Sequence, residues 1–474
     1  MVQEAIRMDV SSTANGGQTA RAVSAIRQRI SARALSPGAR LPSIRSFART
    51  MGVSTSTVVE AYERLVAEGL IQSRPGSGFY VTRVPQPLAL AEIGPRLERA
   101  VDPFWVSRQS LEAAADALKP GCGWLPASWM PEAELRKALR QFARAEAGHL
   151  VDYGTPLGHP LLRQLLSLRM SEQGVVAPAD QILLTESGTQ AIDMLCRLLV
   201  EPGDTVLVDD PCYFNFLALL RAHRVKIVGV PWTPSGPDLA AFAAALGEHR
   251  PRLYITNSGL HNPTGAMLSP ATAHRLLALS GEAGLTIIED DIFGDFCEGP
   301  APRLAALDGL DRVIQIGSFS KTLTAAARCG YIAARPEWIE PLSDLKIATT
   351  FGGNPVSADL VYAILRDGSY RRHLNGLRDR LARARGDVAS RLRALEIHPW
   401  IDPRGGIFLW CELPDGLDGA EIARRALAED VVLAPGNVFS VTQSCATFMR
   451  FNVAQCTDER VFAVLKRVIA AATV

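Results

Sequence analysis

One segment of the chain offers a lysine for covalent chemistry: residues 317–322, with the sequence GSFSKT. The segment follows an apolar run at residues 313–316, which is typical of a buried strand. Open α/β sheets bind their ligands just beyond the ends of such strands. Lys321 at that position can form a Schiff base with an aldehyde. A lone Ser-x-Ser-Lys is also common on solvated surfaces, so the interpretation depends on the groups that surround Lys321.

Two other candidate groups also follow apolar runs. Ser187, Gly188 and Thr189 come after residues 181–185 and open a helical pattern. Their backbone N–H groups would be free at a helix N-terminus, where a phosphate binds well. Tyr213 comes shortly after the run at residues 205–208, where its ring can stack on a flat heterocycle or simply pack in the core.

An amide and two carboxylates complete the set of strand-end groups. Asn262 stands in the sequence HNPTG at residues 261–265, and Asp290 and Asp291 follow the run at residues 285–288. Adjacent carboxylates can bind a metal, but no histidine cluster accompanies them, so a metal site is disfavoured. One carboxylate beside a pyridine nitrogen would keep that nitrogen protonated and make the ring an electron sink.

The elements that must position these groups form a repeating pattern. Short apolar runs alternate with longer helical patterns from about residue 181 onward. The runs are residues 181–185, 205–208, 225–230, 252–256, 285–288, 313–316 and 330–333. Because most runs are continuously apolar rather than alternating, they predict a mostly parallel sheet covered on both faces. This predicts a large α/β domain.

A small basic domain is predicted at residues 19–83. Apolar positions at helical spacing indicate three helices, the second capped by Ser43 and the third by Ser54. The turn at residues 52–54 joins the last two helices into a helix-turn-helix. Residues 70–81 then read as strand, glycine-rich turn and strand, which adds a wing. Arginines outnumber acids in this part, which suits a polyanionic partner.

This small domain resembles the DNA-binding domain of GntR-type bacterial regulators. The matching sequences are residues 37–45 (PGARLPSIR), 52–54 (GVS), 61–65 (AYERL), 68–69 (EG) and 74–78 (RPGSG). The resemblance implies a double-stranded DNA operator as partner. The expected DNA-binding residues are Arg45, Ser54, Thr55, Ser56, Thr57, Arg74, Ser77 and Gly78. The family often has an arginine at the position of Thr55, so its base preference does not carry over.

The length and composition of the chain indicate its domain organisation and its cellular compartment. A chain of 474 residues exceeds one hydrophobic core. Two prolines and no periodic apolar face at residues 84–90 predict a linker over residues 84–100, before a large domain at residues 101–474. The eight cysteines are scattered, without metal-ligand spacing. No signal peptide or membrane span is evident, so we expect a cytoplasmic protein.

In their order along the chain, the strand-end motifs resemble the fold-type I pyridoxal 5'-phosphate enzymes of the aspartate aminotransferase family. The resemblance implies that Lys321 holds the cofactor as a Schiff base. It also implies that Asp290, or Asp291 as the alternative, pairs with the pyridine nitrogen, while Asn262 binds the ring hydroxyl and Tyr213 stacks on the ring.

The same resemblance implies phosphate and substrate contacts. The phosphate-binding residues would be Ser187, Gly188, Thr189, Ser318, Ser320 and Arg328, with Tyr153 reaching the phosphate from the other subunit. Arg450 would bind a substrate α-carboxylate with its two-pronged guanidinium. The family has a tyrosine shortly after the aspartate, whereas this chain has Ile292-Phe293, which removes a hydroxyl near the ring oxygen.

A GntR-type domain fused to an aminotransferase-like domain is similar to the MocR subfamily of bacterial regulators. This similarity implies a homodimer that exchanges its DNA-binding domains and senses an amine, amino acid or vitamin through the cofactor. Two alternatives stay open: an active aminotransferase with an accessory DNA-binding domain, and a regulator that binds no cofactor. The missing tyrosine favours the sensor, and the complete set of cofactor residues disfavours the cofactor-free regulator.

Overall fold

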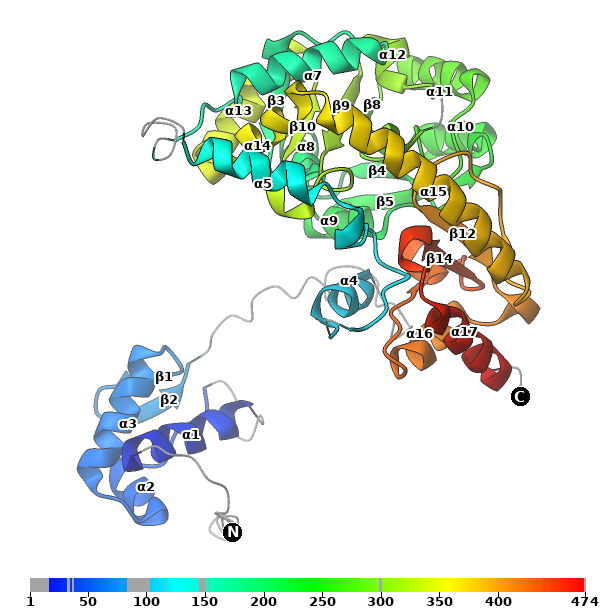
Figure 1. Ribbon diagram of the computed structural model, residues 1–474. Helices are drawn as coiled ribbons and strands as arrows, with labels where there is room; N and C mark the ends of the chain where they lie inside the picture. Colours follow the sequence, from blue (N-terminus) through cyan, green and yellow to red (C-terminus); the bar gives the residue numbers. More distant parts are fainter. Residues whose placement is uncertain are drawn as a thin grey trace. The chain divides into compact units, whose positions relative to one another are not determined.

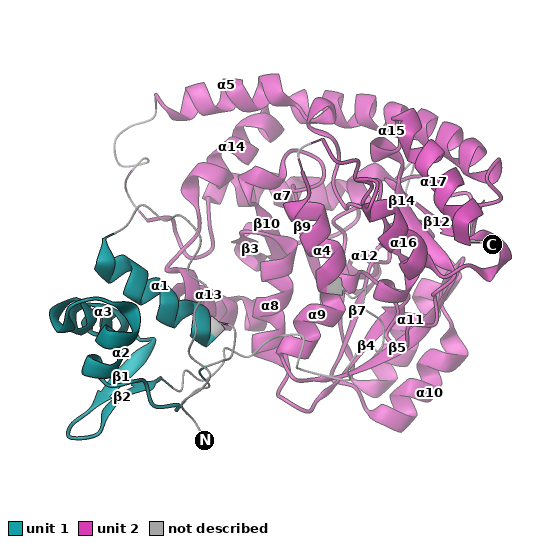
Figure 2. Ribbon diagram, turned by 90° about the horizontal axis from the view of Figure 1, so that it is seen from below, with its two compact units in different colours: residues 1–89 teal, residues 90–474 magenta. Residues whose placement is uncertain are grey.

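The chain divides into two compact units, Met1–Ala89 and Leu90–Val474 (Figure 2). The computed structural model describes residues 17–31, 35, 38–82, 103–114, 116–144, 151, 153–297 and 301–472. The predicted linker at residues 84–100 lies outside the described residues.

The first unit contains three helices and a hairpin (Figure 1). The elements are α1 (Gln18–Ser31), α2 (Ile44–Met51), α3 (Thr55–Ala67), β1 (Ile71–Arg74) and β2 (Gly78–Val81). Ser43 caps α2 by accepting the N–H of Ser46, as its sequence predicts. Gly52 ends α2 with a left-handed φ of 64°, and Ser54 then caps α3. The helix-turn-helix thus follows directly from cap and turn chemistry.

All three helices and both strands share one apolar core in this unit. Tyr62 of α3 is completely buried, and its hydroxyl donates to the carbonyl of Pro42 at 2.8 Å. The strands pair antiparallel, with Ile71 opposite Val81, and both of these side chains are buried. The predicted winged helix-turn-helix is confirmed.

The second unit is built on an eight-stranded sheet. Its strands are β3 (Ile182–Thr185), β4 (Thr205–Asp210), β5 (Lys226–Thr233), β6 (Gly236–Pro237), β7 (Leu253–Thr256), β8 (Thr286–Asp290), β9 (Val313–Ser318) and β10 (Gly330–Ala333). They lie in the order β3-β10-β9-β8-β7-β4-β5-β6. β10 runs antiparallel to both neighbours, β6 runs antiparallel to β5, and the other pairings are parallel. The prediction of a mostly parallel sheet is confirmed.

Helices cover both faces of this sheet (Figure 1). They include α7 (Pro160–Glu172), α8 (Gly188–Leu199), α9 (Phe214–Ala222), α10 (Leu239–His249), α11 (Pro270–Ala283), α12 (Leu304–Asp308), α13 (Pro336–Thr350) and α14 (Pro355–Arg366). Leu207 of β4 packs with α7, α11 and α14, whereas its neighbours Val206 and Val208 pack with α8, α9 and α13. Alternate strand residues therefore supply two cores, one on each face.

A second sheet and the remaining helices complete this unit. The antiparallel sheet has the order β11 (His398–Pro399), β12 (Phe408–Glu412), β14 (Phe448–Asn452) and β13 (Ala434–Pro435). The helices are α4 (Pro103–Glu112), α5 (Glu132–Phe142), α15 (Ser369–Arg393), α16 (Gly419–Leu427) and α17 (Glu459–Ala472). Among the described residues, no helix combines the length and apolar character that crossing a bilayer requires.

Candidate functional site

Most of the predicted cofactor residues line a single cavity of about 250 Å³ in the second unit. It lies beyond the carboxyl ends of β3, β4, β7, β8 and β9, where parallel sheets bind ligands. The predicted residues that line it are Ser187, Gly188, Thr189, Tyr213, Asn262, Asp290, Ser318, Ser320, Lys321, Arg328 and Arg450. The fold thus brings together groups that are spread over more than half of the chain.

Lys321 lies three residues after the end of β9 and is partly buried in this cavity. Burial, together with the positive charge of Arg450, lowers the pKa of its ammonium group to about 8. The preceding turn is ordered by Ser318, whose hydroxyl accepts the N–H of Ser320 at 3.2 Å. A lysine with a pKa near 8 has a substantial neutral fraction in mildly alkaline solution, as a nucleophilic amine requires.

The two adjacent aspartates have different partners. Asp290, the last residue of β8, lines the lysine cavity, and burial raises its pKa to about 6. Asp291 lines a separate small cavity, where Arg303 Nε donates to its Oδ2 at 2.8 Å. Gln315 donates to the same oxygen at 3.2 Å. Asp290 is therefore the carboxylate that faces Lys321, and Asp291 belongs to a buried ion pair.

This difference predicts contrasting effects on stability. We expect Asp291→Asn to lower the free energy of unfolding by about 3 kcal/mol, because it leaves Arg303 as a buried cation without its carboxylate. Asp290→Asn should cost much less, because an amide oxygen can still accept the N–H of Ile292. Urea unfolding of both variants checks this expectation, and equal losses would contradict it.

Arg450 of β14 lines the same cavity and is buried, with 1% of the residue exposed. Its two terminal nitrogens donate to Asn262 Oδ1 at 2.9 Å and to the carbonyl of Gly121 at 2.8 Å. Its Nε has no hydrogen-bond partner among the described residues, and the guanidinium lies 4.1 Å from the centroid of the Phe408 ring. Burial lowers its pKa to about 10. A buried cation that no described carboxylate neutralises suits an anionic ligand.

The phosphate-type donors lie at the N-terminus of α8. Ser187 caps this helix by accepting the N–H of Gln190 at 3.0 Å, and Gly188 follows as its first residue. The first turn of a helix has free N–H groups and a partial positive charge. Ser318, Ser320 and the exposed Arg328 line the same cavity. This set of donors matches an anion with several oxygens.

Tyr213 and Asn262 also lie at this cavity. Tyr213 lines the cavity, with its ring 5.4 Å from that of Phe216. Asn262 is buried, and its side-chain oxygen already accepts from Arg450, so its NH₂ group remains as a donor. The sequence reasoning missed Asn257, which lines the cavity and donates to the backbone carbonyl of Asp290 at 3.0 Å. Its position just after the apolar run that forms β7 is the sequence feature that could have identified it.

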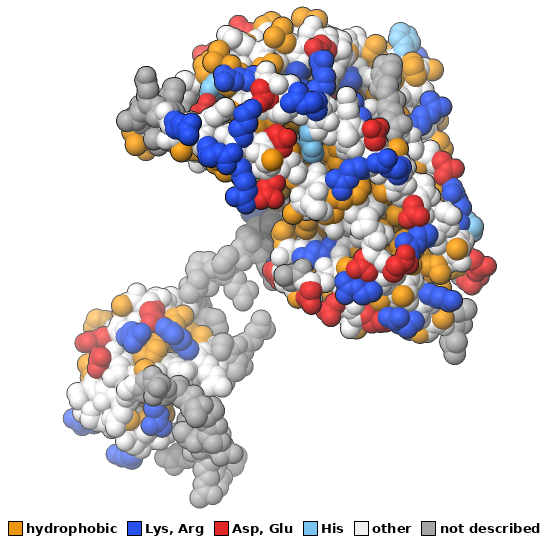
Figure 3. Space-filling model, viewed as in Figure 1, with side chains coloured by type: hydrophobic (Ala, Val, Ile, Leu, Met, Phe, Trp, Pro, Cys, Tyr) orange, Lys and Arg blue, Asp and Glu red, His pale blue; other side chains and the backbone are white. Residues whose placement is uncertain are grey.

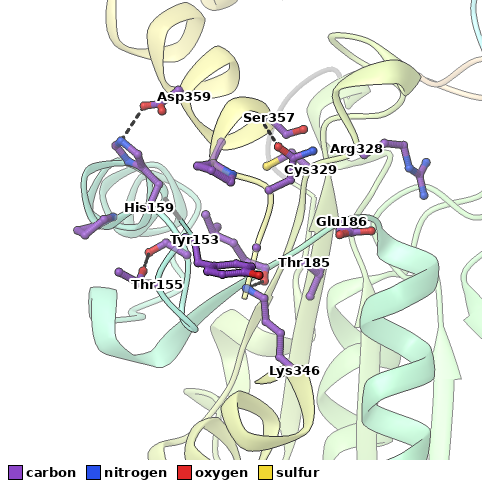
Figure 4. Close-up of a pocket in the computed structure, with 18 of the residues that line it drawn as sticks. Tyr153, Thr155, His159, Thr185, Glu186, Arg328, Cys329, Lys346, Ser357 and Asp359 are labelled. Carbon is purple, nitrogen blue, oxygen red and sulfur yellow. Dashed lines mark hydrogen bonds and ion pairs between the residues drawn. The ribbon is translucent and has the colours of Figure 1, made fainter. Parts of the chain in front are cut away.

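Tyr153 lies outside this cavity. Its side chain is 80% exposed, and its ring lies 5.0 Å from that of Phe351. It lines a neighbouring cavity of about 610 Å³, shown in Figure 4. Arg328 lines both cavities.

The predicted DNA-binding residues lie on the helix-turn-helix and wing of the first unit. Arg45, Thr55 and Ser56 are exposed, while the hydroxyl of Ser54 is engaged in capping α3. Figure 3 shows several basic side chains on the surface of this unit, and all of them are arginines. Thr57 is partly buried behind the cap.

The wing is ordered by its own side chains. The hydroxyls of Ser77 and Tyr80 lie 2.6 Å apart, and the guanidinium of Arg74 lies 4.5 Å from the centre of the Tyr80 ring. Gly78 has a φ of 103°, which glycine adopts readily. A Cβ at Gly78 would lie 3.6 Å from Arg40 Nε, so Arg40, a residue that the sequence reasoning did not single out, lies beside the wing.

Comparisons with known proteins cover both units. The family model for bacterial regulatory proteins of the gntR family matches residues 18–81, and that for aminotransferase class I and II matches residues 126–468. YdcR of Escherichia coli, which is named an uncharacterized HTH-type transcriptional regulator, is 32% identical, over 92% of this chain and 94% of its own. NorG, an HTH-type transcriptional regulator of Staphylococcus aureus, is 28% identical, over 84% of this chain and 92% of its own.

A solved structure extends the similarity to three dimensions. The α-aminoadipate aminotransferase LysN of Thermus thermophilus, complexed with N-(5'-phosphopyridoxyl)-L-leucine, has a TM-score of 0.70 and 26% identity. The similarity covers 78% of this chain and 94% of LysN. With its winged helix and its fold-type I unit, this chain belongs to the MocR-like transcriptional regulators, which join a GntR-type DNA-binding domain to an aminotransferase domain of class I and II.

Proposed function

We propose that this regulator binds pyridoxal 5'-phosphate in the Lys321 cavity, senses an amine or amino acid there, and changes its engagement of operator DNA in response. The observation that carries the proposal is the cavity itself, which combines Lys321, Asp290 and the buried cation Arg450. LysN, which shares the fold, holds a phosphopyridoxyl amino acid. The proposal applies that chemistry to this chain.

The residues present fit the cofactor. The N-terminus of α8, Ser318, Ser320 and Arg328 would bind its phosphate, while Tyr213 and Asn262 would contact its ring. Asp290 would hold a proton on the pyridine nitrogen, and Lys321 would bind the aldehyde. Bound pyridoxal phosphate supplies an aldehyde that exchanges amines and a ring that withdraws electrons.

Arg450 supports a ligand that carries a carboxylate as well as an amine. A guanidinium binds a carboxylate through two parallel hydrogen bonds, and exclusion of water strengthens those bonds. The aromatic ring of Phe408 packs against the guanidinium and limits its movement. A ligand anchored by Arg450 would therefore present its amine towards Lys321 across the same cavity.

Two observations favour a sensor over a working aminotransferase. The relatives that span both units are named as transcriptional regulators. Ile292 lines the cavity near the position at which the aminotransferase resemblance places a tyrosine, so no hydroxyl is available there to the ring oxygen. The alternative, an active aminotransferase with a DNA-binding domain, would be supported by repeated amine transfer to a keto acid.

We further propose that the regulator acts as a homodimer. Tyr153, Phe351 and Val151 are 80%, 65% and 79% exposed, so apolar side chains gather at one edge of the second unit. Such surfaces mark protein contacts. A second copy that covers them would receive Tyr153 near its own phosphate-binding residues. A ligand can shift DNA binding only if it binds two arrangements of this dimer with different affinities.

Visible spectroscopy combined with DNA binding tests the proposal. The protein is loaded with pyridoxal phosphate and titrated with a panel of amino acids and amines, followed by a keto acid. A sensor would show a spectral change that stops after amine binding, together with changed operator affinity. Repeated turnover with the keto acid and no change in DNA binding would support the aminotransferase instead.

The DNA-binding part of the proposal predicts the effect of one arginine. We expect Arg45→Ala to weaken operator binding about tenfold and to reduce the salt dependence by about one counterion, because an exposed cation on α2 would contact DNA. Arg64→Ala serves as control, because Arg64 lies near the C-terminal end of α3, beside Glu68. Fluorescence anisotropy at several salt concentrations measures both variants. Equal effects would place the DNA on another surface.

A further inference from the structure

Lys346 of α13 is a buried cation beside the cavity in Figure 4. Only 1% of the residue is exposed, and its Nζ donates to two backbone carbonyls, those of Pro156 at 2.7 Å and Leu184 at 2.8 Å. In the described part of the chain no carboxylate lies within ion-pair distance of it, and Glu186 acts on it only as a more distant charge. Burial lowers its pKa to about 8. Burying a charged lysine costs free energy, and buried lysines are rare. The position of Lys346 therefore indicates a specific role.

The two carbonyls belong to segments with different tasks. Pro156 lies in the loop at residues 153–159, which begins with the exposed Tyr153. Leu184 lies in β3, which leads directly into the cap of α8 at Ser187. The ammonium of Lys346 therefore joins the loop that presents Tyr153 to the strand that presents the phosphate-binding helix.

The loop is held along its length by further hydrogen bonds. The N–H of Leu184 donates to the carbonyl of Leu157 at 2.9 Å. The Thr155 hydroxyl and Arg163 Nε both donate to the carbonyl of Gly158, at 2.8 Å and 3.2 Å. A loop with this many internal and external bonds has one preferred conformation. Tyr153, at its exposed end, is therefore held in a defined position.

The exposed end packs on the segment that follows Lys346 itself. Tyr153 contacts Phe351, the residue that ends α13, with 5.0 Å between ring centroids. The backbones pack closely next to these rings, because a Cβ at Gly154 would lie 3.1 Å from the carbonyl oxygen of Gly353. Lys346 thus contacts the middle of the loop, while the end of its own helix contacts Tyr153 at the start of the loop.

We propose that Lys346 is a positioning residue that holds Tyr153 in the orientation in which a second copy of the chain receives it at the cofactor cavity. The inference rests on the proposed function, in which the regulator is a homodimer that binds pyridoxal phosphate. Without the ammonium group, the carbonyls of Pro156 and Leu184 would lose their shared donor, and the bond from the Leu184 N–H to the Leu157 carbonyl would hold the loop to β3 less firmly than the two connections together. The effect of Lys346 therefore acts on the partner's cavity.

Substitution in the homodimer gives the first part of the test. Lys346→Met keeps the length of the aliphatic stem and removes the donors, and we expect the affinity for pyridoxal phosphate to fall about tenfold. Lys346→Arg, which restores a cation with several donors, should recover most of that affinity. Lys226→Met is the matched control, because Lys226 is exposed at the start of β5. Absorbance titration and sedimentation measure affinity and dimer formation.

Mixed dimers with two affinity tags separate an effect on the partner from an effect within the chain. In a dimer of Lys321→Ala and Lys346→Met chains, the cavity that keeps Lys321 receives Tyr153 from a chain with intact Lys346, so wild-type affinity is expected. When one chain carries both substitutions and the other is wild type, the wild-type cavity should bind about tenfold more weakly.

The reverse pattern, or equal affinity in both mixed dimers, would overturn the role of Lys346. If the wild-type protein bound no pyridoxal phosphate or formed no dimer, the proposed function itself would be overturned, and this inference depends on it. The two failures are therefore distinguishable in one set of titrations.

Discussion

Replacing Lys321 by alanine is expected to abolish the visible absorption band of bound pyridoxal phosphate and to weaken retention of the cofactor at least about a hundredfold, or about 2.7 kcal/mol. The reason is that Lys321 offers the cavity's amine, while Asp290, Ser187 and Arg450 supply only noncovalent contacts. Binding of the first unit to nonspecific DNA should be unchanged, because its winged helix has its own core. Dialysis followed by spectroscopy measures the loss.

The pH dependence of cofactor loading gives an independent check on Lys321. Burial lowers the pKa of Lys321 to about 8, so its neutral fraction rises as pH increases through that value. The rate of loading should therefore increase from pH 7 to about pH 9 and then level off. Lys226→Ala, which removes an exposed amine, should leave this profile unchanged. A band that persisted in Lys321→Ala would show that another amine binds the cofactor.

The sequence was sufficient to predict the framework of the site. All seven apolar runs are strands of the large sheet, because continuously apolar segments of this length are stable only when covered on both faces. Chemical groups just beyond those strands then meet at one edge of the sheet. The direction of β10 could not be predicted, because an apolar run carries no signal for parallel or antiparallel pairing.

The sequence could not predict which side chains contact one another in the folded chain. The choice between Asp290 and Asp291 depends on Arg303, which lies twelve residues after Asp291 and reaches it only in the folded chain. Lys346 gave no sequence signal, because its acceptors are backbone carbonyls, which every residue has. The contact between Tyr153 and Phe351 likewise joins residues that are nearly two hundred positions apart in sequence. Such contacts follow from tertiary packing rather than from motifs.

Arg450→Met is expected to remove the response to ligands that carry a carboxylate while sparing the response to simple amines. Arg450 is buried and lines the Lys321 cavity, and among the described residues its guanidinium has no carboxylate partner and its Nε has no hydrogen-bond partner. A desolvated two-pronged bond to a ligand carboxylate is worth about 2.7 kcal/mol, or about a hundredfold in affinity. An amine of the same length without the carboxylate never makes that bond, so its affinity should stay within about threefold.

The same substitution should change the stability of the ligand-free protein little, and this makes the binding result interpretable. Methionine removes the donors to Asn262 and Gly121, which is unfavourable, but it also removes the cost of burying an unpaired cation. Arg460→Met, at an exposed position of α17, is the matched control. Titrations of amino acids and their matched amines, read by absorbance, compare the variants. If both ligand classes weakened equally in Arg450→Met, Arg450 would be maintaining the shape of the cavity, and the carboxylate would be bound elsewhere.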